Sequence, residues 1–301
     1  MYNHEMRKKR AYIVLLATAA LFLAGCTSLL AKPTATPTST PTKEPTPTAT
    51  PEPLAASVNG EGITLAAYQS ELQRFQAVPT GTATPVPDDQ AKKQVLDDLI
   101  DQTLLEQGAK KDGYTVDDAT LQQHIDALVK QLGSEQALTD WEKANFYTDQ
   151  SFRDALRLQI AAAWERDKIV ASVPTTADQV HARQILVSSS SLAYQIYDQL
   201  KAGADFATLA YEYDPLTGGD LGWFPKGYLT QSAVEDAAFS LQPGQYSDVL
   251  QTDFGYQIIY VIERDANHPL STDALQVLQH QALQNWLQQQ SSTAKIETLV
   301  P

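Results

Sequence analysis

Few side chains of this sequence belong to the sets that catalyse reactions or bind metal ions. The 301 residues include a single cysteine, Cys26, so that no disulfide within the chain and no cysteine-based metal cluster can form. The GxSxG and HExxH motifs and a pairing of cysteine with histidine are absent from the sequence, which argues against a hydrolase. We therefore expect neither a metal nor another cofactor, and the chemistry of Cys26 has to be judged from its position.

Cys26 follows a segment with the layout of a secretory signal. Residues 7–10 are basic and residues 11–23 form an apolar run, which is too short for the roughly 20 residues that span a membrane. Residues 23–26, LAGC, resemble the bacterial lipobox, in which the cysteine receives diacylglycerol and the signal is cut immediately before it. We predict a lipoprotein signal peptide at residues 1–25 and lipidation at Cys26. The alternative is a plain signal or an uncleaved anchor in which the cysteine is incidental.

The residues after Cys26 are rich in threonine and proline and contain few apolar side chains. Such a composition cannot repay the entropy of folding, so we expect a disordered linker at residues 26–54 that tethers the folded part to the membrane. The whole chain carries a net charge of −14 and has no stripe of basic residues. Because phosphate backbones repel such a chain, nucleic acid is excluded as a partner.

Residues 55–176 carry the signals of a mostly helical domain. The pair Asn59 and Gly60 predicts a hairpin, Thr64 and Asp117 are candidate helix caps, and the proline-containing residues 79–87 predict a loop. Apolar residues then recur at spacings of three and four, which predicts helices that face a core. The predicted core positions are Val95, Leu96, Leu99, Ile100, Leu104, Leu121, Ile125, Leu128, Val129, Leu132, Phe152, Leu156, Ile160 and Trp164.

The pattern changes at about residue 177. Residues 182–187 and 256–262 have the composition of strands, and glycines make residues 218–224 a predicted tight turn. Helices are predicted at residues 192–202, 206–211 and 233–239, so that residues 177–266 form a compact α+β domain. In residues 267–301, a further helix at 274–290 is expected to pack on the helical domain, because its apolar positions would otherwise be exposed.

Four blocks within residues 180–264 resemble the parvulin-type peptidyl-prolyl isomerases, also called PpiC or rotamase domains. The blocks are ARQILV, AGADFATLAYEYD, GGDLGWFPKG and EDAAFSLQPGQYSDVLQTDFGYQIIYVIE, in the order of the family. A signal-anchored chain with a helical region before such a domain and a helix after it is similar to the extracytoplasmic foldases of the PrsA and SurA type. The resemblance implies an α+β fold, in which a small antiparallel sheet flanked by helices is inserted in a mostly helical chaperone domain.

The resemblance also implies candidate site residues. The family usually has one histidine in the first strand and one in the last, and this sequence has Gln184 and Gln257 at those positions. Asp214 corresponds to a residue that faces the substrate, although an aspartate before proline is also a common turn former. Thr252 matches a threonine near the last strand. The apolar residues assigned to proline binding are Leu221, Leu229, Val234 and Phe239.

Glutamines in place of both histidines leave two interpretations open. A hydrogen-bonded pair of Gln184 and Gln257 would replace the cross-strand contact without a titratable group, and rotation about an X-Pro bond needs no proton transfer. Alternatively, the domain has lost its activity and keeps only a groove for peptides. Strand alternation places Gln184 on the face of Ala182 and opposite to His181, which we interpret as a surface or locally bonded histidine.

We therefore expect an extracytoplasmic peptidyl-prolyl cis/trans isomerase and foldase, lipid-anchored on the outer face of the cell membrane. Its partners would be unfolded or partly folded exported proteins with X-Pro bonds. The alternatives are a holdase that binds unfolded polypeptide without catalysis, and a tethered scaffold without affinity for unfolded chains. Residues 188–191 are four serines and offer no positive charge, which argues against a preference for phosphorylated substrates.

Overall fold

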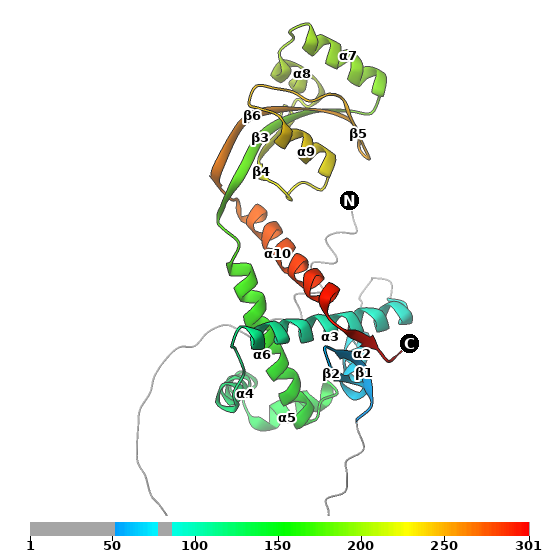
Figure 1. Ribbon diagram of the computed structural model, residues 1–301, viewed down its shortest axis with the longest axis vertical. Coiled ribbons are helices and arrows are strands. Elements are labelled where there is room, and N and C mark those ends of the chain that lie inside the picture. Colours follow the sequence, from blue (N-terminus) through cyan, green and yellow to red (C-terminus); the bar gives the residue numbers. More distant parts are fainter. Residues whose placement is uncertain (1–51, 78–85, 301) are drawn as a thin grey trace, which may run out of the picture.

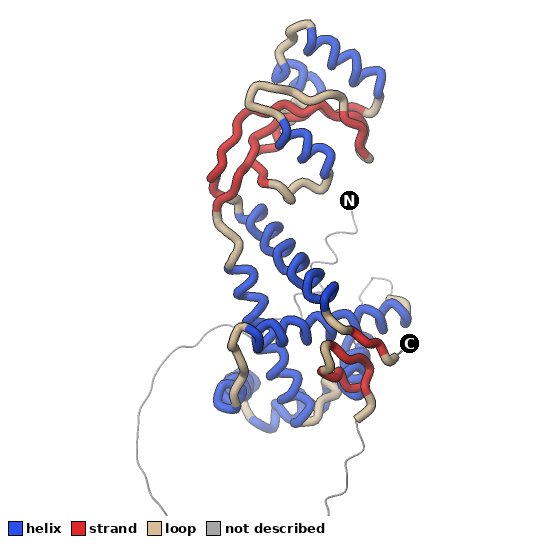
Figure 2. The backbone as a smooth tube through the Cα atoms, in the orientation of Figure 1, coloured by secondary structure: helices blue, strands red, loops and turns tan. Residues whose placement is uncertain are grey.

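A computed structural model describes residues 52–77 and 86–300 of the chain (Figure 1). The predicted signal peptide, Cys26, most of the predicted linker and most of the loop predicted at residues 79–87 lie outside the described residues. Within them, Figure 2 shows a helical region at one end and a strand-rich unit at the other. We call the latter, residues 176–269, the sheet unit.

A small antiparallel sheet begins the helical region and contains both ends of the described chain. Strands β1 (Leu54–Val58) and β2 (Glu61–Thr64) form the predicted hairpin, and Asn59 and Gly60 have the positive φ angles, 55° and 86°, that its turn requires. Strand β7 (Ile296–Thr298) pairs with the other edge of β1. The last strand of the chain therefore completes the sheet that the first strand begins.

Five helices follow this hairpin: α2 (Leu65–Ala77), α3 (Asp88–Lys111), α4 (Asp118–Leu132), α5 (Glu135–Ala144) and α6 (Asp149–Ala171). The predicted caps are present, because Thr64 and Asp117 accept hydrogen bonds from the backbone N–H of Ala67 and Thr120. Helix α5, for which no element was predicted, begins at the cap Ser134. The buried residues of α3, α4 and α6 include most of the predicted core positions, but the prediction for Leu132 was wrong, because this residue in the last turn of α4 is exposed.

The sheet unit is a four-stranded antiparallel sheet covered by helices on both faces. Its strands, β3 (Thr176–Val187), β4 (Asp220–Pro225), β5 (Leu250–Thr252) and β6 (Gly255–Pro269), follow the order β4-β3-β6-β5. Helices α7 (Ser190–Lys201) and α8 (Phe206–Tyr213) cover one face, and α9 (Ser232–Ser240) covers the other (Figure 1). The prediction of a turn throughout residues 218–224 was wrong, because β4 begins at Asp220 and pairs with β3. The turn itself is confined to the residues before this edge strand.

The chain leaves the sheet unit through α10 (Thr272–Thr293), which runs back to the helical region (Figure 1). Helix α10 contacts α3 and α6, and its Trp286 and Leu287 pack in a core cluster with Leu105 and Ile169. In the part of the chain that the structure describes, no helix is long and apolar enough to span a membrane. The predicted fold class, a small antiparallel sheet with helices inserted in a mostly helical chain, is confirmed.

Candidate active site

The two faces of the four-stranded sheet bury different residues. Ala182 of β3 packs with the residues of α9, whereas Ile185 packs with α7 and α8. Alternation along the strand therefore places Gln184 on the α9 face and His181 on the opposite face, as predicted. Nε2 of His181 lies 2.9 Å from Oδ1 of Asp220, so that this histidine is locally bonded. The candidate site is thus on the α9 face.

Three of the predicted apolar residues come together on this face. Leu221 of β4, Val234 of α9 and Leu229 of the loop between these elements belong to one cluster above the sheet. Val234 is buried, and the two leucines are partly exposed. We call these three residues the apolar cup. A half-exposed apolar surface on a rigid sheet is suited to binding an apolar ring from solution.

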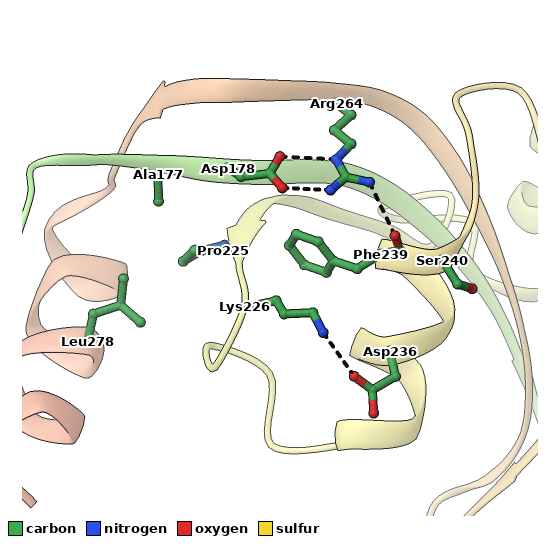
Figure 3. Close-up of a pocket in the computed structure, with 9 residues that line it drawn as sticks. All are labelled: Ala177, Asp178, Pro225, Lys226, Asp236, Phe239, Ser240, Arg264 and Leu278. Carbon is green, nitrogen blue, oxygen red and sulfur yellow. Dashed lines mark hydrogen bonds and ion pairs between the residues drawn. The ribbon is translucent and has the colours of Figure 1, made fainter. Parts of the chain in front are cut away.

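Phe239 packs against the same cluster, but its ring also lines a cavity of about 610 Å³ between the sheet unit and α10 (Figure 3). The guanidinium carbon of Arg264 lies 5.5 Å from the ring centroid, and Nζ of Lys226 lies 5.7 Å from it. Arg264 also forms an ion pair with Asp178, at 2.6 Å. Phe239 therefore lies beside two paired cations, outside the apolar cup.

Gln257 is the most deeply buried polar side chain near the cup, with 1% of its surface exposed. Its Nε2 donates a hydrogen bond of 3.1 Å to Oε1 of Gln231, the residue before α9, and its Oε1 has no partner among the described residues. The expected pair with Gln184 is not formed within this part of the chain. The reason is the register of β3 and β6, which places Gln184 opposite Ile259 and leaves Gln257 opposite Leu186.

Gln184 is half-buried, and its backbone is held against the start of β4. Its N–H donates a hydrogen bond of 2.8 Å to the carbonyl oxygen of Gly219. Gly219 has a φ of +70°, and a Cβ at this position would lie 1.9 Å from the carbonyl oxygen of Gln184. Only glycine fits such an approach. Gly219, the second glycine of the block GGDLGWFPKG, therefore has a structural role: it allows β4 to begin beside Gln184.

Asp214 ends α8 and organises the loop that leads to β4. Its carboxylate accepts hydrogen bonds from the N–H groups of Leu216, Thr217 and Gly219 at 3.2 to 3.3 Å, and from the hydroxyl of Thr217. These donors, the Thr217 hydroxyl first, lower the pKa of Asp214. The structure thus gives Asp214 the turn-forming role, one of the two that the sequence left open.

Thr252 closes the turn between β5 and β6. Its hydroxyl donates to the carbonyl oxygen of Gly255, at 3.0 Å, and accepts from the N–H of Phe254, at 3.3 Å. The Phe254 side chain at the tip of this turn is 66% exposed. Thr252 therefore shapes the end of the hairpin that carries Gln257.

Two side chains that were not predicted from the sequence, Glu235 and Gln231, hold the cup in place. Oε2 of the buried Glu235 accepts a hydrogen bond from the N–H of Gly227, at 2.8 Å, and its Oε1 accepts one from the N–H of Leu229, at 3.1 Å. Gln231 accepts the hydrogen bond of Gln257. The available signal was an acidic residue directly after Val234, in the first turn of a short helix, where a carboxylate often binds free backbone N–H groups.

The site thus combines an apolar cup with an amide pair in a poorly hydrated setting. Such a site holds a ring and presents hydrogen-bonding groups without transferring protons. In residues 52–77 and 86–300, no group of three or more His, Cys, Asp or Glu side chains is placed to hold a metal ion.

Comparisons with known proteins show which family this chain is similar to. A family model described as the PPIC-type PPIASE domain matches residues 171–263, and one described as the SurA-like N-terminal domain matches residues 5–156. The Foldase protein PrsA of Caldanaerobacter subterraneus subsp. tengcongensis is 34% identical over 230 residues, which cover 68% of this chain and 72% of the relative. The PrsA of Geobacillus sp. (strain WCH70) is 30% identical over 221 residues, covering 69% and 76%. A crystal structure of PrsA from Bacillus cereus covers 73% of this chain and 87% of its own, with 23% identity and a TM-score of 0.42.

The fold and the site define a parvulin-type peptidyl-prolyl isomerase domain within a SurA-like helical chain. The chain belongs to the PrsA family of foldases. The predicted family, the enzyme class and the function as an extracytoplasmic isomerase and foldase are confirmed at the level of this family.

Proposed function

We propose that this chain catalyses cis/trans isomerisation of X-Pro bonds in exported polypeptides, and that the apolar cup with the Gln257–Gln231 pair is its active site. The observation that carries the proposal is the placement of Gln257. A buried amide with an unpartnered oxygen weakens a core, so its position favours a functional role: Gln257 binds Gln231 at the start of α9 and lies opposite Leu250, which packs in the same cluster as the cup residues. The alternative is a protein that binds unfolded chains without catalysis, and peptide exchange measured by NMR distinguishes the two.

Rotation about an X-Pro bond breaks no covalent bond, but its barrier is about 18–20 kcal/mol. The catalyst therefore has to favour the twisted amide over both planar forms. In the proposed mechanism, Leu221, Leu229 and Val234 hold the pyrrolidine ring while the preceding carbonyl turns. Because Oε1 of Gln231 is occupied by Gln257, Gln231 has its Nε2–H group to donate to the rotating carbonyl.

Gln184, Asp214 and Thr252 support the site rather than touch the substrate in this proposal. Gln184 lies on the same face, and its partner in the strand register, Ile259, is two residues away from Gln257. Asp214 fixes the turn before β4, and Thr252 fixes the turn between β5 and β6. Phe239 belongs to α9 and lines the cavity that Leu278 of α10 also lines, while it packs with the apolar cluster.

We further propose the division of the chain that the sequence predicts. Residues 1–25 would be the signal peptide, Cys26 the lipidated residue and residues 26–54 the linker on the outer face of the membrane. Residues 177–266 would form the isomerase domain, and residues 55–176 with 267–301 the chaperone domain. The rotamase model, which matches residues 171–263, supports the isomerase domain, whereas the SurA-like model matches residues 5–156 and extends across the boundary proposed at residue 54. The Cys26→Ser variant should move from the membrane fraction to the soluble exported fraction, and retention in the membrane would contradict lipidation.

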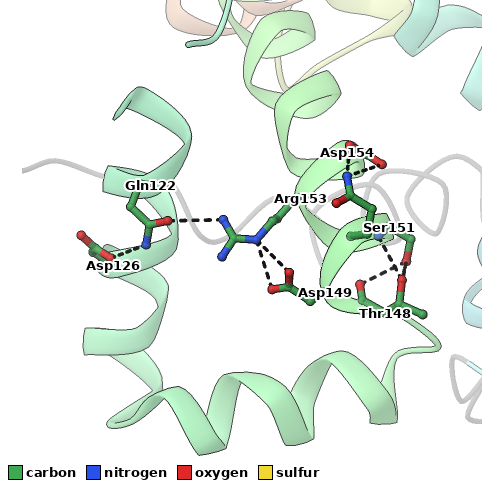
Figure 4. A network of polar contacts seen from close by, with 8 residues as sticks. Gln122, Asp126, Thr148, Asp149, Ser151, Arg153 and Asp154 are labelled. Carbon is green, nitrogen blue, oxygen red and sulfur yellow. Dashed lines mark hydrogen bonds and ion pairs between the residues drawn. The ribbon is translucent and has the colours of Figure 1, made fainter. Parts of the chain in front are cut away.

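The helical region offers a place for a client polypeptide. A cavity of about 770 Å³ between α4, α5 and α6 is lined by the buried apolar residues Ile125, Leu138 and Phe152. Polar side chains connect the helices around it: Arg153 of α6 contacts Asp149 of the same helix at 3.0 Å and Gln122 of α4 at 3.3 Å (Figure 4). We propose that this cavity takes apolar side chains of unfolded exported proteins.

NMR exchange spectroscopy on an unphosphorylated Ala-Pro peptide tests the isomerase function. The full chain should accelerate exchange, and Leu229→Ala should lower kcat/KM by about tenfold or more, because a leucine contact is worth about 1.5–3 kcal/mol. Leu132→Ala, on the surface of α4, is the matched control and should retain the parent value. If the full chain fails to accelerate exchange but suppresses aggregation of an unfolded protein, the binding protein is the correct function.

A further inference from the structure

The loop between β4 and α9, residues 226–231, carries Leu229 of the apolar cup. Two contacts within the sheet unit fix it: the carboxylate of Glu235 binds the N–H groups of Gly227 and Leu229, and the amide of Gln257 binds the last residue of the loop. These contacts hold the loop on its α9 and sheet sides. We call residues 226–231 the cup loop.

A third contact comes from outside the sheet unit. Nε2 of Gln281, in the middle of α10, donates a hydrogen bond to the carbonyl oxygen of Gly227. The approach is close, because a Cβ at Gly227 would lie 2.5 Å from Oε1 of Gln281, and Gly227 has a φ of +86°. The end of the Gln281 side chain therefore lies directly against the backbone of the cup loop, at a glycine whose positive φ other residues rarely adopt.

The position of Gln281 is set by the helical region. Toward the C-terminal end of α10, Trp286 and Leu287 pack with residues of α3 and α6. One turn before Gln281, Leu278 lines the cavity of Figure 3 together with Lys226, the first residue of the cup loop. The same helix thus contacts the cup loop through its middle and the helical core through its C-terminal half.

We propose that Gln281 is a positioning residue of the isomerase site. It holds the cup loop at Gly227, two residues before Leu229, so that the shape of the cup depends on a helix that belongs to the helical region. This inference rests on the proposed function, since it concerns the geometry in which the cup meets the proline ring. A site held in its binding geometry before the substrate arrives loses less entropy on binding.

The variant Gln281→Ala tests the proposal in the full chain. Loss of one hydrogen bond to the loop should lower kcat/KM for the Ala-Pro peptide about threefold to tenfold, chiefly through KM. Gln284→Ala is the matched control, because Gln284 is exposed on the same helix. Gln281→Glu keeps the size of the side chain but removes the donor, so it should lose at least as much activity as Gln281→Ala. Full activity of Gln281→Glu would overturn the hydrogen-bond mechanism.

A double-mutant cycle separates positioning from general destabilisation. If Gln281 acts through Leu229, the double variant Gln281→Ala, Leu229→Ala should be no less active than Leu229→Ala alone, within about twofold. Independent effects that multiply would overturn the proposal, because they would mean that Gln281 does not act through the cup.

Amide hydrogen exchange distinguishes failure of this inference from failure of the proposed function. In Gln281→Ala, the N–H groups of Gly227 and Leu229 should exchange about threefold to tenfold faster than in Gln284→Ala. If the parent chain does not catalyse isomerisation, the proposed function fails and this exchange result still decides whether Gln281 holds the loop. Equal exchange in the two variants would overturn the inference.

Discussion

The two faces of the four-stranded sheet differ in what they bury. Under α7 and α8, the core consists of aliphatic and aromatic residues such as Ile185, Ile196 and Phe206. Under α9, a similar apolar cluster lies beside the amide of Gln257, which is buried with one oxygen unpartnered in the described chain. Each face holds one buried polar atom without a partner in the described chain, since Nε of Arg183 is buried on the α8 side, but only on the α9 face is there a partly exposed apolar cup as well. The difference indicates where the sheet serves the substrate.

The largest expected effect is on the α7 and α8 face. Ile196→Ala should lower the free energy of unfolding by about 2–5 kcal/mol, because Ile196 is fully buried and its loss leaves a cavity. Chemical denaturation measures this change. The folded variant should keep the parent kcat/KM, and a large loss of activity without a loss of stability would break the distinction between the faces.

Gln257→Leu should have the opposite combination of effects, with little change in stability and a large loss of activity. The substitution removes an unsatisfied buried oxygen and keeps a similar volume, so the free energy of unfolding should change by less than about 1 kcal/mol. Isomerase activity should fall about tenfold or more, because Gln231 loses the hydrogen bond that orients it. Denaturation and peptide exchange on the same sample measure both quantities. If this variant keeps the activity of the parent chain, Gln257 does not belong to the active site.

The pH dependence of activity sharpens the comparison, since both histidine positions of the family hold glutamine here. Without an imidazole beside the apolar cup, kcat/KM should vary by less than about twofold between about pH 5.5 and pH 8. Gln257→His should introduce a transition below the ordinary histidine pKa of about 6.5, because burial at this position disfavours the charged imidazole. His181→Gln, on the opposite face, should leave the profile flat. A transition in the parent chain that His181→Gln abolishes would contradict the assignment of faces.

The smallest effect concerns the turn between α8 and β4, which the carboxylate of Asp214 stabilises. Because its hydrogen bonds hold the pKa of Asp214 below the ordinary value of 3.8, the stabilisation of the turn is complete above that value and is lost as the pH falls through the lowered pKa. Exchange of the Thr217 and Gly219 amides should therefore increase in this acidic range. Asp214→Asn should show no such pH dependence, and the parent behaviour in this variant would assign the effect to another group.

Local patterns predicted most of the elements. The hairpin at Asn59 and Gly60 and the helices that begin after Thr64 and Asp117 depend on contacts within a few residues, which the sequence displays directly. Strand β7 was not predicted, because its three residues acquire their conformation from pairing with β1, at the other end of the chain. Edge strand β4 was not predicted for a different reason: Gly222 within it and Gly218 and Gly219 before it favour a turn in the sequence.

The candidate site was predictable as a set of positions but not as a set of contacts. The alternation that placed Gln184 on the site face is a property of one strand. The partner of Gln257 depends on the register between two strands and on where α9 begins, and these choices favour Gln231. Glu235 and Gln281 were missed because their partners are backbone groups, which no side-chain pattern reveals.

The pairing of the first strand with the last has a consequence for the order of folding during export. Strand β1 emerges first from the membrane, but β7 and α10, which complete its sheet and the helical core, emerge last. The sheet unit has all of its own strands earlier and is free to fold before them. In this order, the isomerase site would form while the helical region is still incomplete, because α10 and β7 have not yet emerged.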